Sequence, residues 1–182
     1  METITELHVF DFDETIVRMP SFTGKKQVET DDLKFDHPYD FYDHPESLSE
    51  SAYHIQLISP VYEAWQRASR LETCYTILVT HRVKSLEKEV KAVLDARGVE
   101  FNEYFFLGRV REKIEILNEV LEKLPNVKEV SIYEDSIQQL HRYQTYLEYR
   151  EDISFKLHMV DKSKVYQIDP FTVRNEKKIR LV

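Results

Sequence analysis

The sequence predicts an α/β protein with a three-layer, Rossmann-like arrangement around a mostly parallel, five-stranded sheet. Strand-like and helix-like segments alternate from residue 74 to residue 160, which is the pattern of βαβ units. The chain has 182 residues, of which 42% are hydrophobic, so one domain with a packed core is expected. Ligands of parallel sheets bind beyond the carboxyl ends of the strands, so we expect the functional residues directly after each strand.

The first strand is predicted at residues 4–11, where an apolar run ends in a carboxylate. Residues 16–58 are polar and irregular, and a segment of this length in a compact domain is usually functional or disordered. Its aromatic side chains argue against disorder, so we expect a loop-rich, cap-like insertion with one helix near residues 47–57, within a single domain of residues 1–182. His37 and His44 of this insertion are expected to be hydrogen-bonded or solvated rather than metal-bound.

The next helix is predicted to begin with Ser59 as N-cap and Pro60 in the first helical position. Residues 74–80 form a β-rich run. Apolar positions at helical spacing then predict a helix over residues 83–97, with Gly98 as its C-cap.

A short strand at residues 103–107 is followed by an apolar stripe at helical spacing. The stripe consists of Val110, Ile114, Leu117, Leu121 and Leu124, and Pro125 ends it. A strand at 127–133, a helix at 136–149 and a strand at 153–160 complete the alternation.

The negative charge is concentrated in one segment. The chain carries 33 acidic and 25 basic residues, a net charge of −8. Residues 29–50 hold eight acids and one base, so this segment alone contributes −7. This distribution argues against a protein that coats nucleic acid through a broad basic face, although it does not exclude binding of a strand end or a small phosphorylated molecule. The basic tail after Val173 is interpreted as a solvated segment.

Glycine and cysteine are rare in this chain, and their scarcity excludes several classes of binding site. Three glycines exclude a Walker loop and a GxGxxG dinucleotide site. The single cysteine, Cys74, excludes an internal disulfide and a multi-cysteine zinc site, and it fits a reducing compartment. Because no run of 18 apolar residues and no basic-apolar leader is found, we expect a cytoplasmic protein with no membrane partner.

Charged and hydroxyl side chains gather at the predicted carboxyl edge of the sheet. They are Asp11, Asp13 and Thr15 after the first strand, Thr80 and Arg82 after the second, Lys113 in the helix after the third, and Glu134 and Asp135 after the fourth. Clustered carboxylates repel one another unless a cation neutralises them, and oxygen ligands suit Mg²⁺. Taken singly, each residue has an ordinary structural explanation such as a turn or a helix cap. Their succession at one edge favours phosphoryl transfer.

Four stretches resemble motifs one to four of the haloacid dehalogenase (HAD) superfamily of Mg²⁺-dependent phosphohydrolases. They are HVFDFDETIV, ILVTHR, the region of Lys113, and SIYEDS. A narrower likeness links YDFYDHPESL, the helix with Trp65, TILVTHR and SIYEDS to the Swiss Army knife RNA-repair-like HAD domains. Those domains usually carry a tryptophan pair, TGR and EDR, where this chain has Phe41 and Tyr42, His81, and Ser136.

The resemblance implies a role for each strand-end residue. Asp11 would be the nucleophile that forms an aspartyl-phosphate, and Asp13 the general acid and then the base. Thr15 would brace the turn at the substrate, Thr80 would hydrogen-bond a phosphoryl oxygen, and Lys113 would neutralise the nucleophile and the phosphoryl group. Phe12, by strand alternation, would point into the core.

The resemblance also implies a Mg²⁺ site made of Asp11, the backbone carbonyl of Asp13, and the pair Glu134 and Asp135. Which member of that pair binds the ion directly is open. Arg82 has two alternatives, a bidentate contact to the substrate or a salt bridge to Glu134 or another acid of the site. Lys113 is preferred to Arg111 and Lys123 as the catalytic cation because it stands early in its helix and off the apolar stripe.

Three functions remain in competition. The favoured one is a Mg²⁺-dependent phosphomonoesterase acting on a phosphorylated small molecule, a nucleotide or a nucleic-acid end. The alternative is a catalytically silent HAD-like protein that recognises a phosphorylated partner, which the completeness of the motif residues disfavours. A receiver-type phosphoacceptor domain is disfavoured because its phosphoacceptor follows the third strand, whereas DFDET here follows the first. The oligomeric state is not predicted.

Overall fold

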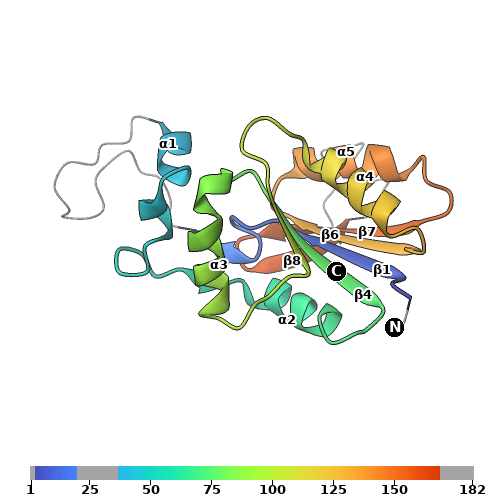
Figure 1. The fold of residues 1–182 in the computed structure, drawn as a ribbon, viewed down its shortest axis with the longest axis horizontal. Coiled ribbons are helices and arrows are strands. Elements are labelled where there is room, and N and C mark those ends of the chain that lie inside the picture. The colour runs from blue at the N-terminus through green and yellow to red at the C-terminus, as the bar shows by residue number, and fades with distance from the viewer. Residues whose placement is uncertain (1–2, 20–36, 169–182) are drawn as a thin grey trace.

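The computed structural model, which describes residues 3–19 and 37–168, contains a six-stranded sheet (Figure 1). Its strands are β1 (Glu6–Phe10), β4 (Cys74–Thr80), β5 (Glu103–Phe106), β6 (Glu129–Glu134), β7 (Ser154–Asp161) and β8 (Lys164–Ile168). They lie in the order β5-β4-β1-β6-β7-β8, and all neighbours from β5 to β7 run parallel. The mostly parallel, Rossmann-like fold predicted from the alternation is therefore confirmed.

The sheet has one strand more than the five expected. β8 pairs antiparallel with β7 through a tight connection in which Lys162 has a φ of 58°. Two-residue hairpins of this kind favour asparagine or glycine, and the connection here consists of Lys162 and Ser163. The sequence thus lacks the turn signal that marks a hairpin, which explains why this edge strand escapes prediction.

Helices cover both faces of the sheet and make three layers (Figure 1). They are α2 (Ser59–Ala68) and α3 (Glu87–Asp95) on one face, and α4 (Lys113–Lys123) and α5 (Ile137–Leu147) on the other. Along β1 the side chains alternate between the two cores. Leu7 and Val9 pack with α4 and α5, while Phe10 packs with α2 and α3.

Three helix starts differ from the sequence prediction. α3 begins at Glu87 rather than at residue 83, after the 3₁₀ helix η2 (Lys84–Leu86). The N-cap of α2 is Ile58 rather than Ser59. The Ile58 N–H donates to the Ile16 carbonyl, and the Ile58 backbone is extended rather than helical. α4 begins at Lys113, and Val110 is 89% exposed instead of forming part of the apolar stripe. The turn after β5 contains Gly108 with a φ of 57°, which delays the helix. The C-cap of α3 is Ala96 rather than Gly98, and Gly98, with a φ of 67°, lies two residues later in the turn that follows the helix.

The two ends of the insertion lie side by side, because β2 (Val17–Arg18) pairs antiparallel with β3 (Gln56–Leu57). The helices inside it are α1 (Pro38–Tyr42) and the 3₁₀ helix η1 (Pro45–Leu48), not one helix at 47–57. Each begins with a His-Pro pair in which the histidine Nδ1 accepts a backbone hydrogen bond. His37 accepts from Tyr39 at 3.2 Å and His44 from Glu46 at 3.1 Å. These histidines are helix caps, which agrees with their expected hydrogen-bonded state.

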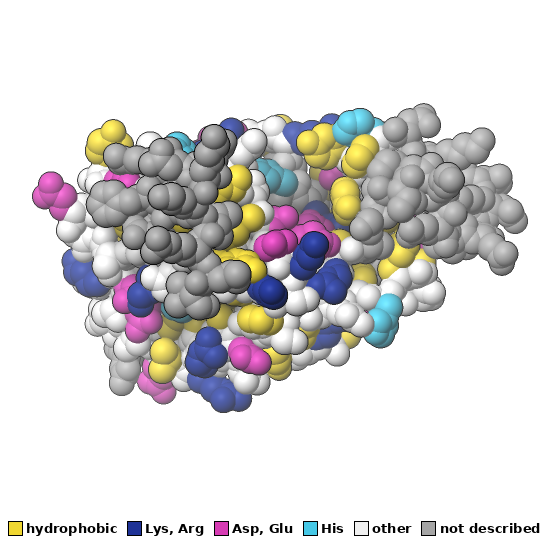
Figure 2. All heavy atoms as spheres, turned by 180° about the vertical axis from the view of Figure 1, so that it is seen from behind, with side chains coloured by type: hydrophobic (Ala, Val, Ile, Leu, Met, Phe, Trp, Pro, Cys, Tyr) yellow, Lys and Arg dark blue, Asp and Glu magenta, His cyan; other side chains and the backbone are white. Residues whose placement is uncertain are grey.

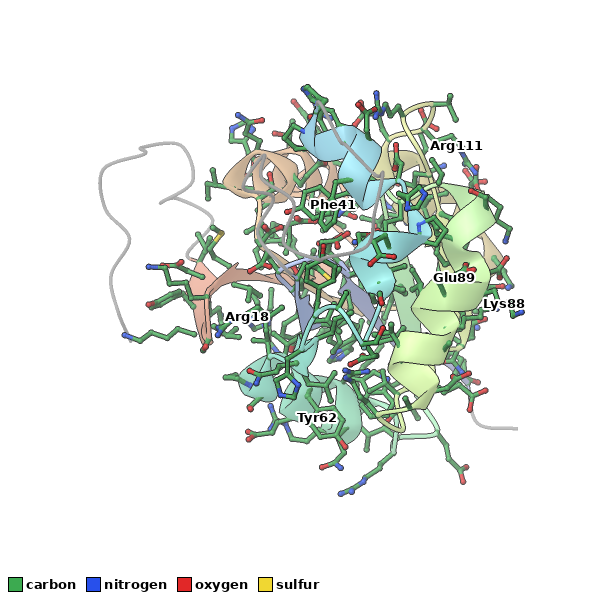
Figure 3. The ribbon with its side chains drawn as sticks, turned by 90° about the vertical axis from the view of Figure 1, so that its left-hand side faces the viewer. Arg18, Phe41, Tyr62, Lys88, Glu89 and Arg111 are labelled. Carbon is green, nitrogen blue, oxygen red and sulfur yellow. The ribbon has the colours of Figure 1, made fainter. Side chains whose placement is uncertain are left out.

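The end-on view places α1 with Phe41 at the top, α2 with Tyr62 at the bottom, and α3 with Lys88 and Glu89 at the side (Figure 3). Phe41 is only 4% exposed and meets the ring of Tyr53 edge-on, so α1 is anchored by apolar packing. Of the acidic segment 29–50, residues 29–36 lie outside the described part, as does the basic tail.

Within residues 3–19 and 37–168, no helix has the length and apolar character needed to cross a bilayer. The cytoplasmic location and the single domain of residues 1–182 stay predictions. Asp31, Asp32 and Asp36 of the acidic segment lie outside the described residues, so the cap-like role of the insertion stays a prediction.

Candidate active site

Three neighbouring strands bring the predicted motif residues to one edge of the sheet. Asp11 directly follows β1, Thr80 ends β4, and Glu134 ends β6. Since β1 lies between β4 and β6 and all three run parallel, their carboxyl ends are adjacent. The Asp11 N–H bonds to the Tyr133 carbonyl at 3.1 Å, which continues the ladder and fixes the backbone beneath its carboxylate.

A buried lysine links the first and fourth motifs. The Nζ of Lys113 lies 2.6 Å from Oδ1 of Asp11 and 2.6 Å from Oε2 of Glu134. The Lys113 side chain is 3% exposed. Burial lowers the pKa of this ammonium, but the attraction of Asp11 and Glu134 outweighs burial and raises the pKa overall. Lys113 is therefore a permanent positive charge between two carboxylates.

Asp11, Glu134 and Asp135 form a group that can hold a metal ion, because one carboxylate oxygen of each lies within 4.8 Å of the others. Burial and repulsion by Asp11 and Glu134 raise the pKa of Asp135 to about 9. Burial also raises the pKa of Glu134, against the lowering effect of Lys113. A divalent cation removes this repulsion, and a donor set made only of oxygens fits Mg²⁺.

The turn after β1 braces Asp11. Thr15 is fully buried, and its Oγ1 donates to Oδ2 of Asp11 at 3.2 Å. The backbone N–H groups of residues 15–17 point to the Phe12 carbonyl, and Glu14 takes a φ of 54° to close the turn. Phe12 itself is fully buried in the core that packs α2 and α3, so its predicted inward orientation is confirmed.

Arg82 forms a salt bridge with Asp13. Its Nε lies 3.1 Å from each Asp13 carboxylate oxygen, and its Nη2 lies 2.8 Å from Oδ1. Nη1 donates to the Tyr42 carbonyl at 2.6 Å and to Oγ of Ser47 at 2.8 Å. With 2% exposure, Arg82 is a buried link between Asp13 and the insertion. Of its two alternatives, the structure contains the salt bridge, and the partner is Asp13 rather than Glu134.

Burial raises the pKa of Asp13, and the Arg82 guanidinium partly opposes this effect. The Asp13 side chain keeps 30% of its surface exposed, so water moderates the rise. This residual exposure also leaves the carboxyl group accessible to a ligand. Asp13 thus combines a fixed orientation with access from solvent.

Thr80 and the two cations weighed against Lys113 were also named from the sequence, and the structure gives the partners of each. Thr80 is fully buried, and its Oγ1 accepts from the Arg82 N–H at 3.2 Å. Arg111 pairs with Glu115 and Glu119 on the surface of α4, and Lys123 pairs with Glu103. Neither competitor reaches Asp11, so Lys113 is the cation at this carboxylate.

Sequence reasoning missed two partners of Arg82, the Ser47 hydroxyl and the Tyr42 carbonyl. Ser47 is fully buried, although it lies in a polar, acidic segment of the sequence. Its neighbours in the HPESL stretch carry no signal for an arginine 35 positions away. Only the His-Pro pattern that starts η1 hints that this stretch is ordered.

Arg109 and Tyr39 lie together in the two segments that hydrogen-bond to Arg82. The Arg109 guanidinium lies over the ring of Tyr39 at 4.6 Å, and its Nη2 pairs with Asp43 at 3.1 Å. Tyr39 remains 57% exposed. The loop that carries Arg109 is tied to the site, because the Gly108 N–H bonds to the Arg82 carbonyl at 3.2 Å. On the described surface in Figure 2, basic side chains are interspersed with acidic ones and form no continuous basic face.

Comparison with known proteins yields one family. The family described as HAD domain family 1 in Swiss Army Knife RNA repair proteins matches residues 43–178. No curated protein matches the chain. A solved structure described as "Structure of Pnkp1/Rnl/Hen1 complex" is similar with a TM-score of 0.48 and 14% identity, over 84% of this chain and 45% of that chain. The chain therefore spans less than half the length of that protein, and a similarity at this level carries no functional argument.

Proposed function

The chain belongs to HAD domain family 1 of the Swiss Army Knife RNA repair proteins, and from this premise we propose that it is a Mg²⁺-dependent phosphomonoesterase that acts through an aspartyl-phosphate. The observation that carries the proposal is the environment of Asp11. This carboxylate stands between the Lys113 ammonium at 2.6 Å and the Thr15 hydroxyl at 3.2 Å, beside the acidic pair Glu134 and Asp135. An oriented carboxylate next to a buried cation is what nucleophilic attack on phosphorus needs.

Mg²⁺ would be held by Asp11, Asp135 and the backbone carbonyl of Asp13, and when bound it supplies positive charge to the phosphoryl oxygens. We assign the direct ligand of the motif-four pair to Asp135. Glu134 already uses Oε2 for Lys113 at 2.6 Å and Oε1 for the Ser136 N–H at 3.1 Å. Glu134 therefore orients Lys113, while Asp135 is the carboxylate that gains most from a cation.

In the first half of the reaction, an Asp11 carboxylate oxygen attacks phosphorus and forms an O–P bond as the bond from phosphorus to the ester oxygen breaks. Asp13 gives its proton to the departing ester oxygen. In the second half, Asp13 takes a proton from water, whose oxygen attacks phosphorus and releases phosphate from Asp11. Lys113 and the Thr80 hydroxyl would stabilise the charge on the phosphoryl oxygens during both transfers.

We propose a nucleotide or a nucleic-acid terminal phosphate as substrate. Tyr39 is exposed, and its ring already stacks with the His37 imidazole and the Arg109 guanidinium, so this group offers an aromatic edge and a cation that a nucleotide could contact. Tyr39 and Arg109 belong to segments joined to Asp13 through Arg82. The mixed charge of the face drawn in Figure 2 favours a short end over a long polyanion there.

The test is phosphate release from an aryl phosphate, sugar phosphates, nucleotides and 3′- or 5′-phosphorylated oligoribonucleotides, with Mg²⁺ and with chelator. We expect Mg²⁺-dependent turnover that Asp11→Asn removes. Tyr39→Ala should raise KM for oligoribonucleotides and leave the aryl phosphate unaffected. If no ester is hydrolysed while phosphorylated oligonucleotides still bind, the catalytically silent alternative replaces this proposal.

A further inference from the structure

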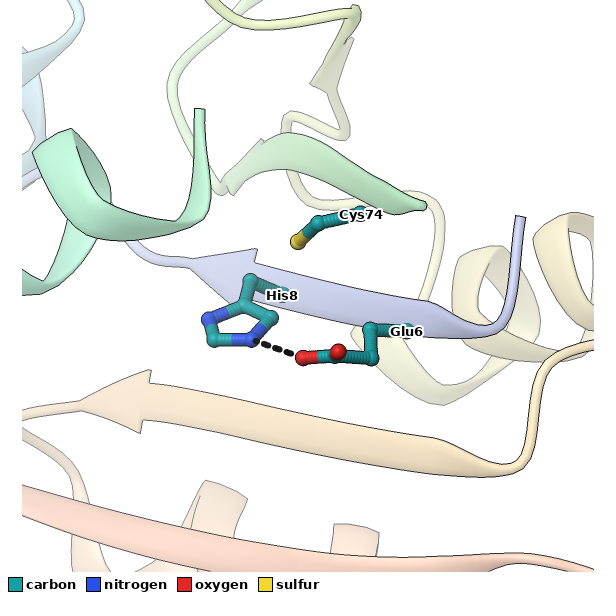
Figure 4. A group of neighbouring side chains, drawn as sticks. All are labelled: Glu6, His8 and Cys74. Carbon is teal, nitrogen blue, oxygen red and sulfur yellow. Dashed lines mark ion pairs between the residues drawn. The ribbon is translucent and has the colours of Figure 1, made fainter. Parts of the chain in front are cut away.

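A second group of potential metal ligands lies at the opposite end of the strands from Asp11. Glu6 and His8 are two residues apart on β1, so their side chains share one face of the sheet. Cys74, the first residue of β4, is the register partner of Glu6 and therefore stands beside it. Figure 4 shows the three side chains together, with the His8 imidazole directed at the Glu6 carboxylate.

The donor atoms are close enough to share one ion. One donor atom each of Glu6, His8 and Cys74 lies within 4.8 Å of the other two. The His8 Nε2 and the Glu6 Oε2 are 3.7 Å apart. Ligands around tetrahedral Zn²⁺ stand about 2.0–2.3 Å from the ion, and hence roughly 3.5 Å from one another. Small side-chain rotations are therefore sufficient to close the group around an ion.

The group is accessible, and His8 is held only on its Glu6 side. Its Nε2 faces Glu6, whereas its Nδ1 is buried and has no hydrogen-bond partner among the described residues. Cys74 is 6% exposed, whereas the Glu6 side chain keeps 34% exposure and offers an approach from solvent. The nearby cation Lys156 is paired with Glu129, so its positive charge is countered.

We propose that Glu6, His8 and Cys74 form a binding site for a zinc-class divalent cation. A thiolate with an imidazole selects Zn²⁺ over Mg²⁺, which takes oxygen ligands. On binding, a sulfur–metal bond replaces the S–H bond of Cys74, the proton leaves to solvent, and water completes the fourth position. The ion joins β1 to β4, two central strands, at their amino-terminal ends. This site does not depend on the proposed phosphatase activity.

The experiment uses the full chain, stripped with chelator and titrated with Co²⁺ and then Zn²⁺. Cobalt bound to a thiolate gives a sulfur-to-metal absorption band in the near ultraviolet, which Zn²⁺ displaces. We expect the wild type and Asp135→Ala each to bind one equivalent of Co²⁺ that shows this absorption band. Cys74→Ser should abolish the band and weaken binding by at least about tenfold, since one of three protein ligands is lost.

Two further variants keep the test decisive if Cys74→Ser folds poorly. Glu6→Gln should weaken Co²⁺ binding while keeping the sulfur band, and Glu151→Gln, at an exposed acid outside the group, should change neither. Zn²⁺ should raise the melting temperature of the wild type and of Glu151→Gln. A Co²⁺ spectrum without the sulfur band in the wild type overturns the proposal. So does binding that survives in Cys74→Ser and disappears in Asp135→Ala, because the ion then occupies the acidic group.

Discussion

The Nζ of Lys113 lies 2.6 Å from Oδ1 of Asp11, although the two residues are 102 positions apart in the chain. Lys113 is the first residue of α4, and Asp11 is the first residue after β1. The contact therefore depends on the helix start as much as on the strand. It brings a cation to a carboxylate that is otherwise surrounded by Glu134 and Asp135.

Replacing Asp11 with asparagine should abolish turnover while leaving the fold intact. The amide keeps the shape of the carboxylate but is not a nucleophile, so kcat should fall by several orders of magnitude, on the order of 10³ or more. Activity and the melting temperature are measured on the same preparation. Asp95→Asn, at an exposed aspartate of α3, is the matched control. Near-normal activity of Asp11→Asn would exclude Asp11 as the nucleophile.

Removing the Lys113 charge should destabilise the protein. Lys113→Met leaves two buried carboxylates facing each other, and the loss of one partner of a buried ion pair costs roughly 3–5 kcal/mol of unfolding free energy. Urea denaturation measures this loss. The double variant Lys113→Met with Glu134→Gln should regain stability but not turnover, because the cation at Asp11 is still missing. Equal stability of both variants would contradict the arrangement.

Mg²⁺ should raise the melting temperature of the wild type by mass action, and Asp135→Asn should remove this effect. The folded-state pKa of Asp135 is raised, so without metal the unfolded state loses its proton at lower pH and stability falls as pH rises toward 9. Metal-free Asp135→Asn should accordingly melt above the metal-free wild type at pH 8. Glu151→Gln, at an exposed acid, serves as control. A Mg²⁺ shift that persists in Asp135→Asn would place the ion elsewhere.

Arg82 should act by positioning Asp13. Arg82→Gln removes the salt bridge and the bonds to Tyr42 and Ser47, so kcat should fall by about tenfold or more while KM changes less. The unsatisfied groups should cost roughly 1–3 kcal/mol of stability. Hydrogen exchange at residues 37–48 should increase in this variant and stay unchanged in Arg142→Gln. If KM rises and kcat does not change, Arg82 contacts the substrate instead.

Stability should fall on acidification because of His158. This imidazole stacks on Tyr133 at 4.3 Å, and burial, with help from His8 and Lys156, lowers its pKa to about 4. Between this value and the unfolded pKa near 6.5, the unfolded state binds more protons, so stability declines as pH falls.

His158→Phe keeps the stacking and removes the proton site. From pH 7 to pH 5 the wild type should lose roughly 2 kcal/mol more unfolding free energy than His158→Phe. His141→Gln, at an exposed histidine, should follow the wild type. Denaturant curves at several pH values measure the difference, and parallel pH profiles of wild type and His158→Phe would refute this assignment.

The sequence by itself determined the layers of the fold and the edge where the motif residues meet. Hydrophobic periodicity is local, so the alternation from residue 74 to residue 160 was sufficient to predict parallel strands with helices on both faces. Parallel strands place their carboxyl ends together, so the sequence predicted Asp11, Thr80 and Glu134 at one edge of the sheet. β8 escaped prediction because its turn carries no glycine or asparagine, and α4 started late because Gly108 turns the chain first.

Only the tertiary structure decided which side chains pair. Arg82 joins Asp13 and Ser47, which lie 69 and 35 positions away, and such partners depend on packing that no local pattern records. The same holds for Glu6, His8 and Cys74, which meet because β1 and β4 pair in one particular register. A shift of that register by one residue would send the Cys74 side chain to the opposite face of the sheet, because side-chain direction alternates along a strand.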